Sequence, residues 1–204
     1  MNFHHLYLNN PTRQLVRPML AATCAAVLLA VPSFASAAIF PGGPGADTLI
    51  GGIDPDTFYG RGGADYIWGA EGDDKMYGGR GDDDLNGNEG KDRLYGERGD
   101  DSMKGGPDED KLFGGPGKDE MNGDSEADKL SGGPGDDSIN GDDGDDVLYL
   151  GRGADDAWGS EGDDTIYSVA RDRKVDEIDC GNGTDSARVR PEDTTVNCET
   201  VVVL

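Results

Sequence analysis

The chain has 204 residues with a formal net charge of −24, only 34% of its residues are hydrophobic, and 34 are glycine. A composition of this kind buries too little apolar surface for an ordinary core and is typical of disordered chains. So acidic a chain is repelled by nucleic acid and by anionic membranes, which argues against both as partners and favours cations.

Residues 1–37 differ in composition from the rest of the chain. Arg13 and Arg17 precede the apolar run MLAATCAAVLLAVPSFASA, and Ala35-Ser36-Ala37 has the small-residue pattern of a signal-peptidase site. The apolar part of this run is about 15 residues, shorter than the ~20 that a membrane-spanning helix needs. We expect a secretory signal peptide that is removed on export. An uncleaved membrane anchor is the alternative, and a lipoprotein linked through Cys24 fits less well.

Removal of this segment would change the chemistry of the mature chain. His4 and His5 would leave with it, so the mature chain would contain no histidine. A H-E-x-x-H zinc site and a Ser-His-Asp triad both need that residue. We therefore expect a protein that is not an enzyme. The remaining catalytic alternative is acid–base attack on a glycan by the many carboxylates.

A nine-residue repeat follows a short lead-in, residues 38–41, and fills residues 42–167 with 14 units in unbroken phase. The first units are GGPGADTLI, GGIDPDTFY and GRGGADYIW. Position one is Gly in 13 units, position four is Gly in 11, and position eight is Leu, Ile, Met or Phe in 13. Position six is aspartate in every unit: Asp47, Asp56, Asp65, Asp74, Asp83, Asp92, Asp101, Asp110, Asp119, Asp128, Asp137, Asp146, Asp155 and Asp164.

This pattern resembles the G-G-x-G-x-D-x-U-x nonapeptide of the hemolysin-type calcium-binding proteins, the repeat-in-toxin (RTX) family. The resemblance implies an all-β fold, a right-handed parallel β-roll or β-solenoid that binds Ca²⁺ between successive turns. The ligands that it implies are the sixth-position aspartates and the adjoining turn carbonyls. At most about 12 ions would be sandwiched between the coils.

Physical reasoning from the repeat leads to the same fold. A Gly-rich turn of six residues followed by a three-residue strand makes half a coil, with the eighth residue pointing inward. One apolar side chain per unit makes a thin core, and stacked aspartates ~4.8 Å apart repel one another. Ca²⁺ accepts carboxylates and carbonyls together, Mg²⁺ suits this arrangement less well, and transition metals prefer His or Cys. We therefore expect a disordered chain without calcium and a β-roll with it.

Four units depart from the pattern. Asp54, Asp108 and Glu126 replace the fourth-position glycine, and Leu150 replaces a first-position glycine. We expect weaker or altered calcium sites in these units.

Residues 168–204 follow the last full unit. After three residues out of phase, two degraded units, RDRKVDEID and CGNGTDSAR, place Asp176 and Asp185 at the sixth position. The pattern D-x-I-D-C-G-x-G-x-D…C-E-x-V resembles the cysteine-containing ends of small exported proteins of the same family. We expect a cap over the last coil. In an exported chain Cys180 and Cys198 most simply form one disulfide, and a redox role is the alternative.

The ninth position of the even-numbered units is aromatic in all but one case. These residues are Tyr59, Tyr77, Tyr95, Phe113, Tyr149 and Tyr167. On a β-roll they would form a ladder on one outer face. We expect them to stack and stiffen the sheet. A docking face for a glycan, another protein or a second copy of the chain is the alternative.

The sequence thus predicts a calcium-binding protein that is secreted to the extracellular space, with the periplasm or cell surface as alternative destinations. Its expected role is that of a structural or interaction module. The alternatives are an adhesin, matrix or surface-layer protein that uses the aromatic face, and a calcium-dependent partner of another exported protein. Membrane insertion is not expected, because the mature chain has no hydrophobic or amphipathic insertion segment.

Overall fold

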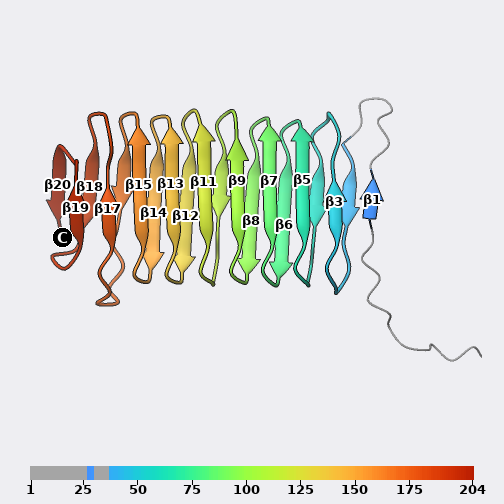
Figure 1. Ribbon diagram of the computed structural model, residues 1–204, viewed down its shortest axis with the longest axis horizontal. Coiled ribbons are helices and arrows are strands. Elements are labelled where there is room, and N and C mark those ends of the chain that lie inside the picture. The colour runs from blue at the N-terminus through green and yellow to red at the C-terminus, as the bar shows by residue number, and fades with distance from the viewer. Residues whose placement is uncertain (1–26, 30–36) are drawn as a thin grey trace, which may run out of the picture.

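The structure is a computed structural model that describes residues 27–29 and 37–204, which form two facing β-sheets along one rod (Figure 1). The expected signal peptide lies outside the described residues, apart from Val27–Leu29 and Ala37. The same holds for His4, His5 and Cys24. Within the described part of the chain, no helix is long and apolar enough to cross a membrane.

Each sheet has ten strands in the described part of the chain, and every strand lies beside the next but one in sequence. The odd sheet contains β1 (Val27–Leu29), β3 (Thr48–Ile50), β5 (Tyr66–Glu71), β7 (Asp84–Glu89), β9 (Ser102–Gly106), β11 (Glu120–Ser125), β13 (Ser138–Asp143), β15 (Asp156–Glu161), β17 (Glu177–Asp179) and β19 (Thr194–Val196). The even sheet contains β2 (Ile39–Pro41), β4 (Thr57–Tyr59), β6 (Lys75–Arg80), β8 (Arg93–Arg98), β10 (Lys111–Phe113), β12 (Lys129–Pro134), β14 (Val147–Arg152), β16 (Thr165–Tyr167), β18 (Ser186–Val189) and β20 (Thr200–Val203).

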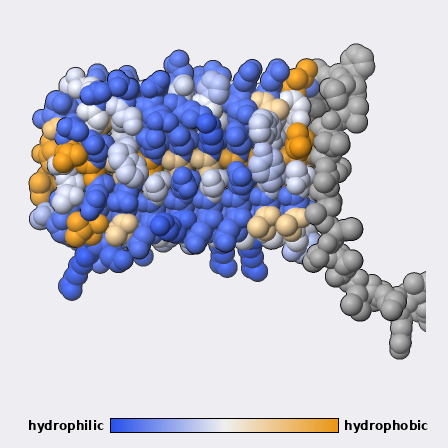
Figure 2. All heavy atoms as spheres, viewed as in Figure 1, coloured by the Kyte–Doolittle hydropathy of each residue, from blue (hydrophilic) through white to orange (hydrophobic). Residues whose placement is uncertain are grey.

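The pairing register follows the repeat. Leu49 pairs in parallel with Ile67, 18 residues further on, because two nine-residue units complete one coil. Across the predicted break of phase the offset becomes 21 residues, and Ala157 pairs with Ile178. The parallel β-solenoid predicted from the sequence is therefore confirmed. Seventh and ninth residues point outward, which gives the mainly hydrophilic surface seen in Figure 2.

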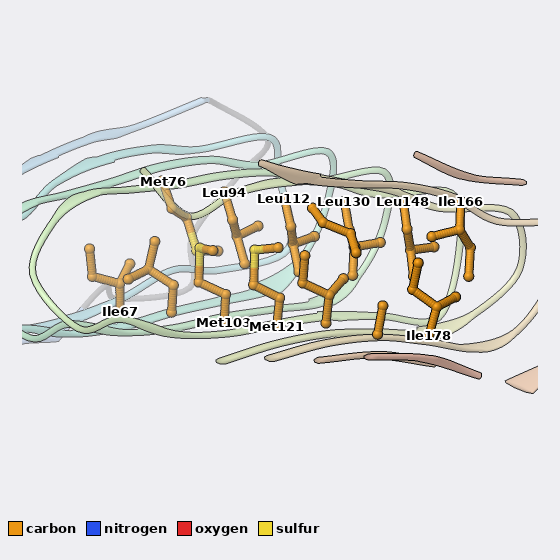
Figure 3. Packing of buried hydrophobic residues seen from close by; sticks show 14 of the residues in the cluster. Ile67, Met76, Leu94, Met103, Leu112, Met121, Leu130, Leu148, Ile166 and Ile178 are labelled. Carbon is orange, nitrogen blue, oxygen red and sulfur yellow. The ribbon is translucent and has the colours of Figure 1, made fainter. Parts of the chain in front are cut away.

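The core consists of two facing columns of side chains between the sheets, one column from each sheet (Figure 3). The eighth-position residues of all 14 units are at most 2% exposed, as the inward position predicts. The odd-sheet column is Leu49, Ile67, Leu85, Met103, Met121, Ile139 and Ala157. The even-sheet column is Phe58, Met76, Leu94, Leu112, Leu130, Leu148 and Ile166. Leu150, which replaces a glycine, joins this core and is fully buried.

The lead-in already belongs to the solenoid. Strand β2 pairs with β4 and places Phe40 in the core, where its ring stacks on Phe58 with centroids 4.7 Å apart. The first hydrophobic contact of the even sheet is therefore made ahead of the first recognisable repeat.

The C-terminal segment continues both sheets by two strands each, β17 to β20. Ile178 and Ala187 extend the two core columns into it. The predicted disulfide is present: Cys180 and Cys198 are bonded, with Cα atoms 5.1 Å apart. The last coil covers these core residues and leaves β20 exposed along its whole length.

The aromatic ladder is also present on the outer side of the even sheet. The rings of Tyr59, Tyr77, Tyr95 and Phe113 stack with centroids 4.9–5.1 Å apart and interplanar angles of 6–7°. A second stack joins Tyr149 to Tyr167 at 4.8 Å. Each inner ring thus covers the faces of its neighbours, as expected for side chains that stiffen the sheet.

Candidate calcium-binding turns

The sixth-position aspartates lie in two rows, one at each edge of the solenoid, where the turns lead into the strands. All 14 are buried, with at most 7% of the residue exposed. The structure adds one more member to each row, Asp176 and Asp185, which are 5% and 1% exposed. Both occupy the sixth position of the degraded units but are not among the ligands predicted from the sequence. Buried carboxyl groups at this density need a compensating interaction.

One oxygen of each carboxylate is used to hold successive coils together. Asp83 Oδ1 accepts the backbone N–H of Asp65, one coil earlier, at 2.8 Å, and Asp101 Oδ1 accepts that of Asp83 at 2.8 Å. The same bond recurs along both rows at 2.7–3.0 Å. Each sixth-position aspartate from Asp56 onward is therefore fixed in orientation by the coil that precedes it.

The other oxygen has no such partner. Among the described residues, the following atoms are buried without any hydrogen bond: Oδ2 of Asp65, Asp74, Asp83, Asp92, Asp101, Asp110, Asp119, Asp128, Asp137, Asp146, Asp155, Asp164 and Asp185. An unsatisfied buried polar atom costs about 1–3 kcal/mol, and more when it is charged. Thirteen repetitions of the same orphaned oxygen indicate a ligand of opposite charge.

Backbone carbonyls converge on these orphaned oxygens. A Cβ atom built at Gly96 would overlap Asp101 Oδ2 and would lie 2.7 Å from the carbonyl oxygen of Gly114. At Gly78 the same atom would overlap Asp83 Oδ2 and lie 2.9 Å from the carbonyl oxygen of Gly96. The first-position glycine is thus required because a carboxylate of its own turn and a carbonyl of the next coil meet over it.

The donors at these turns are all oxygens. Among the described residues, no three His, Cys, Asp or Glu side chains converge on one point, so a metal ion must draw on backbone carbonyls as well. Ca²⁺ takes six to eight oxygen ligands at ~2.3–2.6 Å and tolerates irregular geometry, which fits one fixed carboxylate oxygen beside carbonyls. The residues present therefore fit calcium.

The fourth position brings successive backbones into contact. Gly81 has φ +120° and Gly99 has φ +134°, and a Cβ on either would overlap the carbonyl oxygen one coil earlier. Two of the departures from the pattern keep this left-handed conformation with a side chain, Asp108 at φ 86° and Glu126 at φ 71°. Such residues are strained there. Weaker calcium binding at these units remains a prediction.

Burial raises the pKa of the sixth-position carboxyl groups from Asp65 onward above the ordinary value of an aspartate. Desolvation is the largest cause, repulsion between stacked carboxylates adds to it, and the hydrogen bond from the preceding coil opposes it. The pKa rises to about 6 for Asp101, Asp119 and Asp146, about 7 for Asp74, Asp83, Asp128, Asp137, Asp155 and Asp164, about 8 for Asp92, and about 9 for Asp110. At neutral pH, part of each row would therefore be protonated in the folded chain, and a bound cation would favour the ionised form.

Comparison with known proteins agrees with this chemistry. A family model described as the RTX calcium-binding nonapeptide repeat matches residues 41–76, 68–103, 77–110, 86–121, 96–130, 122–157 and 149–168. These matches together span residues 41–168, more than half of the chain. A search of curated proteins finds no match.

Proposed function

Because the chain belongs to the RTX calcium-binding nonapeptide repeat family and binds several calcium ions in its β-roll, we propose that the sixth-position aspartates are the calcium ligands. The observation that carries this proposal is the buried, orphaned Oδ2 atom repeated from coil to coil. The ions would lie between turns one coil apart, at most about 12 for two rows of seven turns. Asp176 and Asp185 offer one further turn to each row.

Calcium would act as the folding switch of the chain. The core holds only one apolar side chain for most nine-residue units, and two rows of buried carboxylates oppose its formation. Because the sites exist only in the folded coil, the free energy of ion binding becomes free energy of folding. Sites rich in carbonyl ligands in extracellular modules work near 10⁻⁴–10⁻³ M calcium. The chain would then stay unfolded inside the cell and fold outside it.

The proposed location is extracellular, with residues 1–37 as a removed signal peptide, residues 42–167 as the β-roll and residues 168–204 as its C-terminal cap. The support is the signal-peptide composition of the first segment and the calcium demand of the fold. A non-catalytic role is supported by the repeat itself, because ligation accounts for the buried carboxylates. We therefore propose a structural or interaction module.

An adhesin-like role through the aromatic ladder is the other candidate. The faces of Tyr77 and Tyr95 are covered by neighbouring rings, so mainly ring edges remain for a partner. This arrangement favours the stiffening role over docking by stacking on the ring faces.

The test is far-UV circular dichroism of residues 38–204, titrated with CaCl₂ or MgCl₂ after removal of metal by a chelator. We expect a cooperative coil-to-β transition with calcium and none at the same magnesium concentrations. A spectrum that ignores calcium would refute the folding switch.

A further inference from the structure

The two outer faces of the solenoid carry opposite charge. On the described strands of the even sheet there are eight cations and one acid, Glu97. The cations are Lys75, Arg80, Arg93, Arg98, Lys111, Lys129, Arg152 and Arg188. We call this outer side of the even sheet the basic face. A chain with net charge −24 thus gathers eight of its 18 lysines and arginines away from the acidic turns.

The odd sheet shows the reverse. Its described strands carry eleven acids and one cation, Lys104, which pairs with Asp124 at 2.9 Å. The acids are Glu71, Asp84, Glu89, Glu120, Asp124, Asp142, Asp143, Asp156, Glu161, Glu177 and Asp179. We call this outer side the acidic face.

Register places the charges in columns. Lys75, Arg93, Lys111 and Lys129 occupy the same position on four adjacent strands of the basic face. Neighbours ~4.8 Å apart repel by about 1 kcal/mol even in bulk water. Among the described residues the ion pairs are Lys91–Glu109, Lys104–Asp124 and Lys174–Asp136, so no column cation forms a salt bridge, and Glu109 attracts Lys111 only at longer range. An opposing acidic surface would relieve this repulsion.

The acidic face provides such a surface, with an acid on every second coil of the corresponding column. Asp84, Glu120 and Asp156 occupy this column of the odd sheet, separated by Ser102 and Ser138. The strands of both faces repeat once per coil along the same axis, so each acid of one copy can lie opposite a pair of neighbouring cations of another over several coils. Both faces also carry exposed aromatic side chains, as specific interfaces often do, for example Tyr59 and Trp68 at 41% and 37% exposure.

The area is sufficient for a specific contact. Strands β4 to β18 of the even sheet are three to six residues long. At ~3.3 Å per residue and ~4.8 Å between strands, they give a face of about 600 Å². Two such faces in contact would bury about 1,200 Å², at the lower end of the ~1,200–2,000 Å² of stable specific interfaces.

We propose that the folded chain associates with a second copy by placing its basic face on the neighbour's acidic face. The interface is heterologous, so each bound copy leaves one face free and a third copy can add. The inference rests on the proposed function, because both faces exist only once calcium has ordered the coils. Since its driving force is ionic, the contact should weaken as salt shortens the Debye length from ~20–30 Å to a few ångströms.

The test is sedimentation velocity of residues 38–204 in saturating CaCl₂ at low and high NaCl. We expect oligomers at low salt and association at least about tenfold weaker at high salt. Lys75→Glu/Lys111→Glu places two acids in the cation column of the basic face, and Asp84→Lys/Glu120→Lys places two cations in the acidic column of the other face. Each double variant alone should associate more weakly than the parent chain, and an equimolar mixture should associate more strongly than either variant alone, because it pairs an intact acidic face with an intact basic face.

The matched control is Lys118→Glu/Arg171→Glu, which changes the net charge as much as the basic-face variant does but away from both faces. It should associate like the parent chain. The inference would be overturned if the parent chain folds with calcium but stays monomeric. It would also be overturned if neither double variant weakens association. If the parent chain is monomeric but binds polyglutamate, the basic face binds an anionic polymer instead of a second copy. Circular dichroism separates the two proposals, because failure to fold with calcium counts against the proposed function and monomeric folded protein counts only against this inference.

Discussion

Asp83 accepts the backbone N–H of Asp65 through Oδ1 at 2.8 Å and keeps Oδ2 buried without a hydrogen-bond partner among the described residues. The two oxygens of one carboxylate therefore have different tasks. Oδ1 links successive coils through its hydrogen bond, and Oδ2 is free to bind a cation in the turn. This division lets substitutions separate the stacking of the coils from the binding of ions.

The first prediction uses the amide that is isosteric with aspartate. Asp101→Asn keeps a carbonyl oxygen for the N–H of Asp83 and removes the charge that a cation needs. We expect the calcium concentration at the folding midpoint to rise, by roughly twofold to tenfold for one site among many, since calcium affinity depends on ligand charge. Asp100→Asn is the control, because Asp100 is an exposed neighbour that bonds the N–H of Lys118. Equal midpoints for the two variants would contradict the assignment of Asp101.

The second prediction concerns the first-position glycine. Gly96→Ala would push a methyl group against Asp101 Oδ2 and the carbonyl oxygen of Gly114. Overpacking of this kind costs about 1–3 kcal/mol, so the calcium midpoint should rise and the transition should lose cooperativity. Gly52→Ala is the control, because a Cβ there would meet no atom of the described residues within 4 Å. If both variants fold like the parent chain in a calcium titration, the carboxylate and carbonyl do not meet over Gly96.

The third prediction concerns pH. In the folded chain without metal, burial raises the pKa of Asp110 to about 9 and of Asp92 to about 8, whereas an unfolded aspartate has a pKa near ~3.9. Between these values the folded state binds more protons than the unfolded state, so its stability falls as pH rises. The contribution is fully present below about pH 4 and is lost through pH 6–9.

Protons and calcium should therefore compete for the same oxygens. We expect the calcium midpoint to be higher at about pH 5 than at about pH 8, and the metal-free chain to gain β-structure on acidification. Circular dichroism at both pH values, with calcium and with chelator, measures the two effects. A calcium midpoint that does not move with pH would mean that the buried carboxylates are not the groups that calcium ionises.

The fourth prediction concerns the gap in the aromatic ladder. Ser131 lies in register between Phe113 and Tyr149, and a ring there would join the two stacks. We expect Ser131→Tyr to stabilise the calcium-loaded fold by about 0.5–1.5 kcal/mol. Lys129 Nζ lies 4.9 Å from the centroid of the Tyr149 ring, and the new ring would disturb this contact. The expected stabilisation already allows for its loss. Thermal unfolding in saturating calcium measures it. Asn122→Tyr, flanked by Lys104 and Asn140, is the control and should not stabilise the fold comparably.

Most of the architecture was predictable because one nine-residue rule is repeated with few exceptions. The eighth-position columns and the stacking of the sixth-position aspartates follow from positions in the unit, and the disulfide follows from the two cysteines of an exported chain. The length of the strands did not. A three-residue strand was expected, yet β7 runs from Asp84 to Glu89, because pairing with the next coil continues into the following turn. Phe40 was missed as a core residue because its turn lacks the glycines and aspartate of the repeat.

The orphaned oxygen could not be predicted in the same way. The sequence shows that Asp83 belongs to a column but not which oxygen is used by the preceding coil. The charged faces do follow from the alternation of units that predicts the aromatic ladder, because Lys75 and Asp84, in consecutive units, lie on opposite sides of the rod. Net charge hides them, because it describes the whole chain and not each surface.

Because one coil contains two units, insertions or deletions of one unit and of two units have different consequences for the chain. Gain or loss of 18 residues would lengthen or shorten the rod and change the number of ion sites, with every later side chain still on its own face. Gain or loss of nine residues would satisfy the turn chemistry equally well. It would nevertheless move every later strand to the other sheet, mixing lysines into the acidic columns and aspartates into the basic ones. The unit of calcium binding is the nonapeptide, whereas the unit that can be inherited without scrambling the surface is the pair.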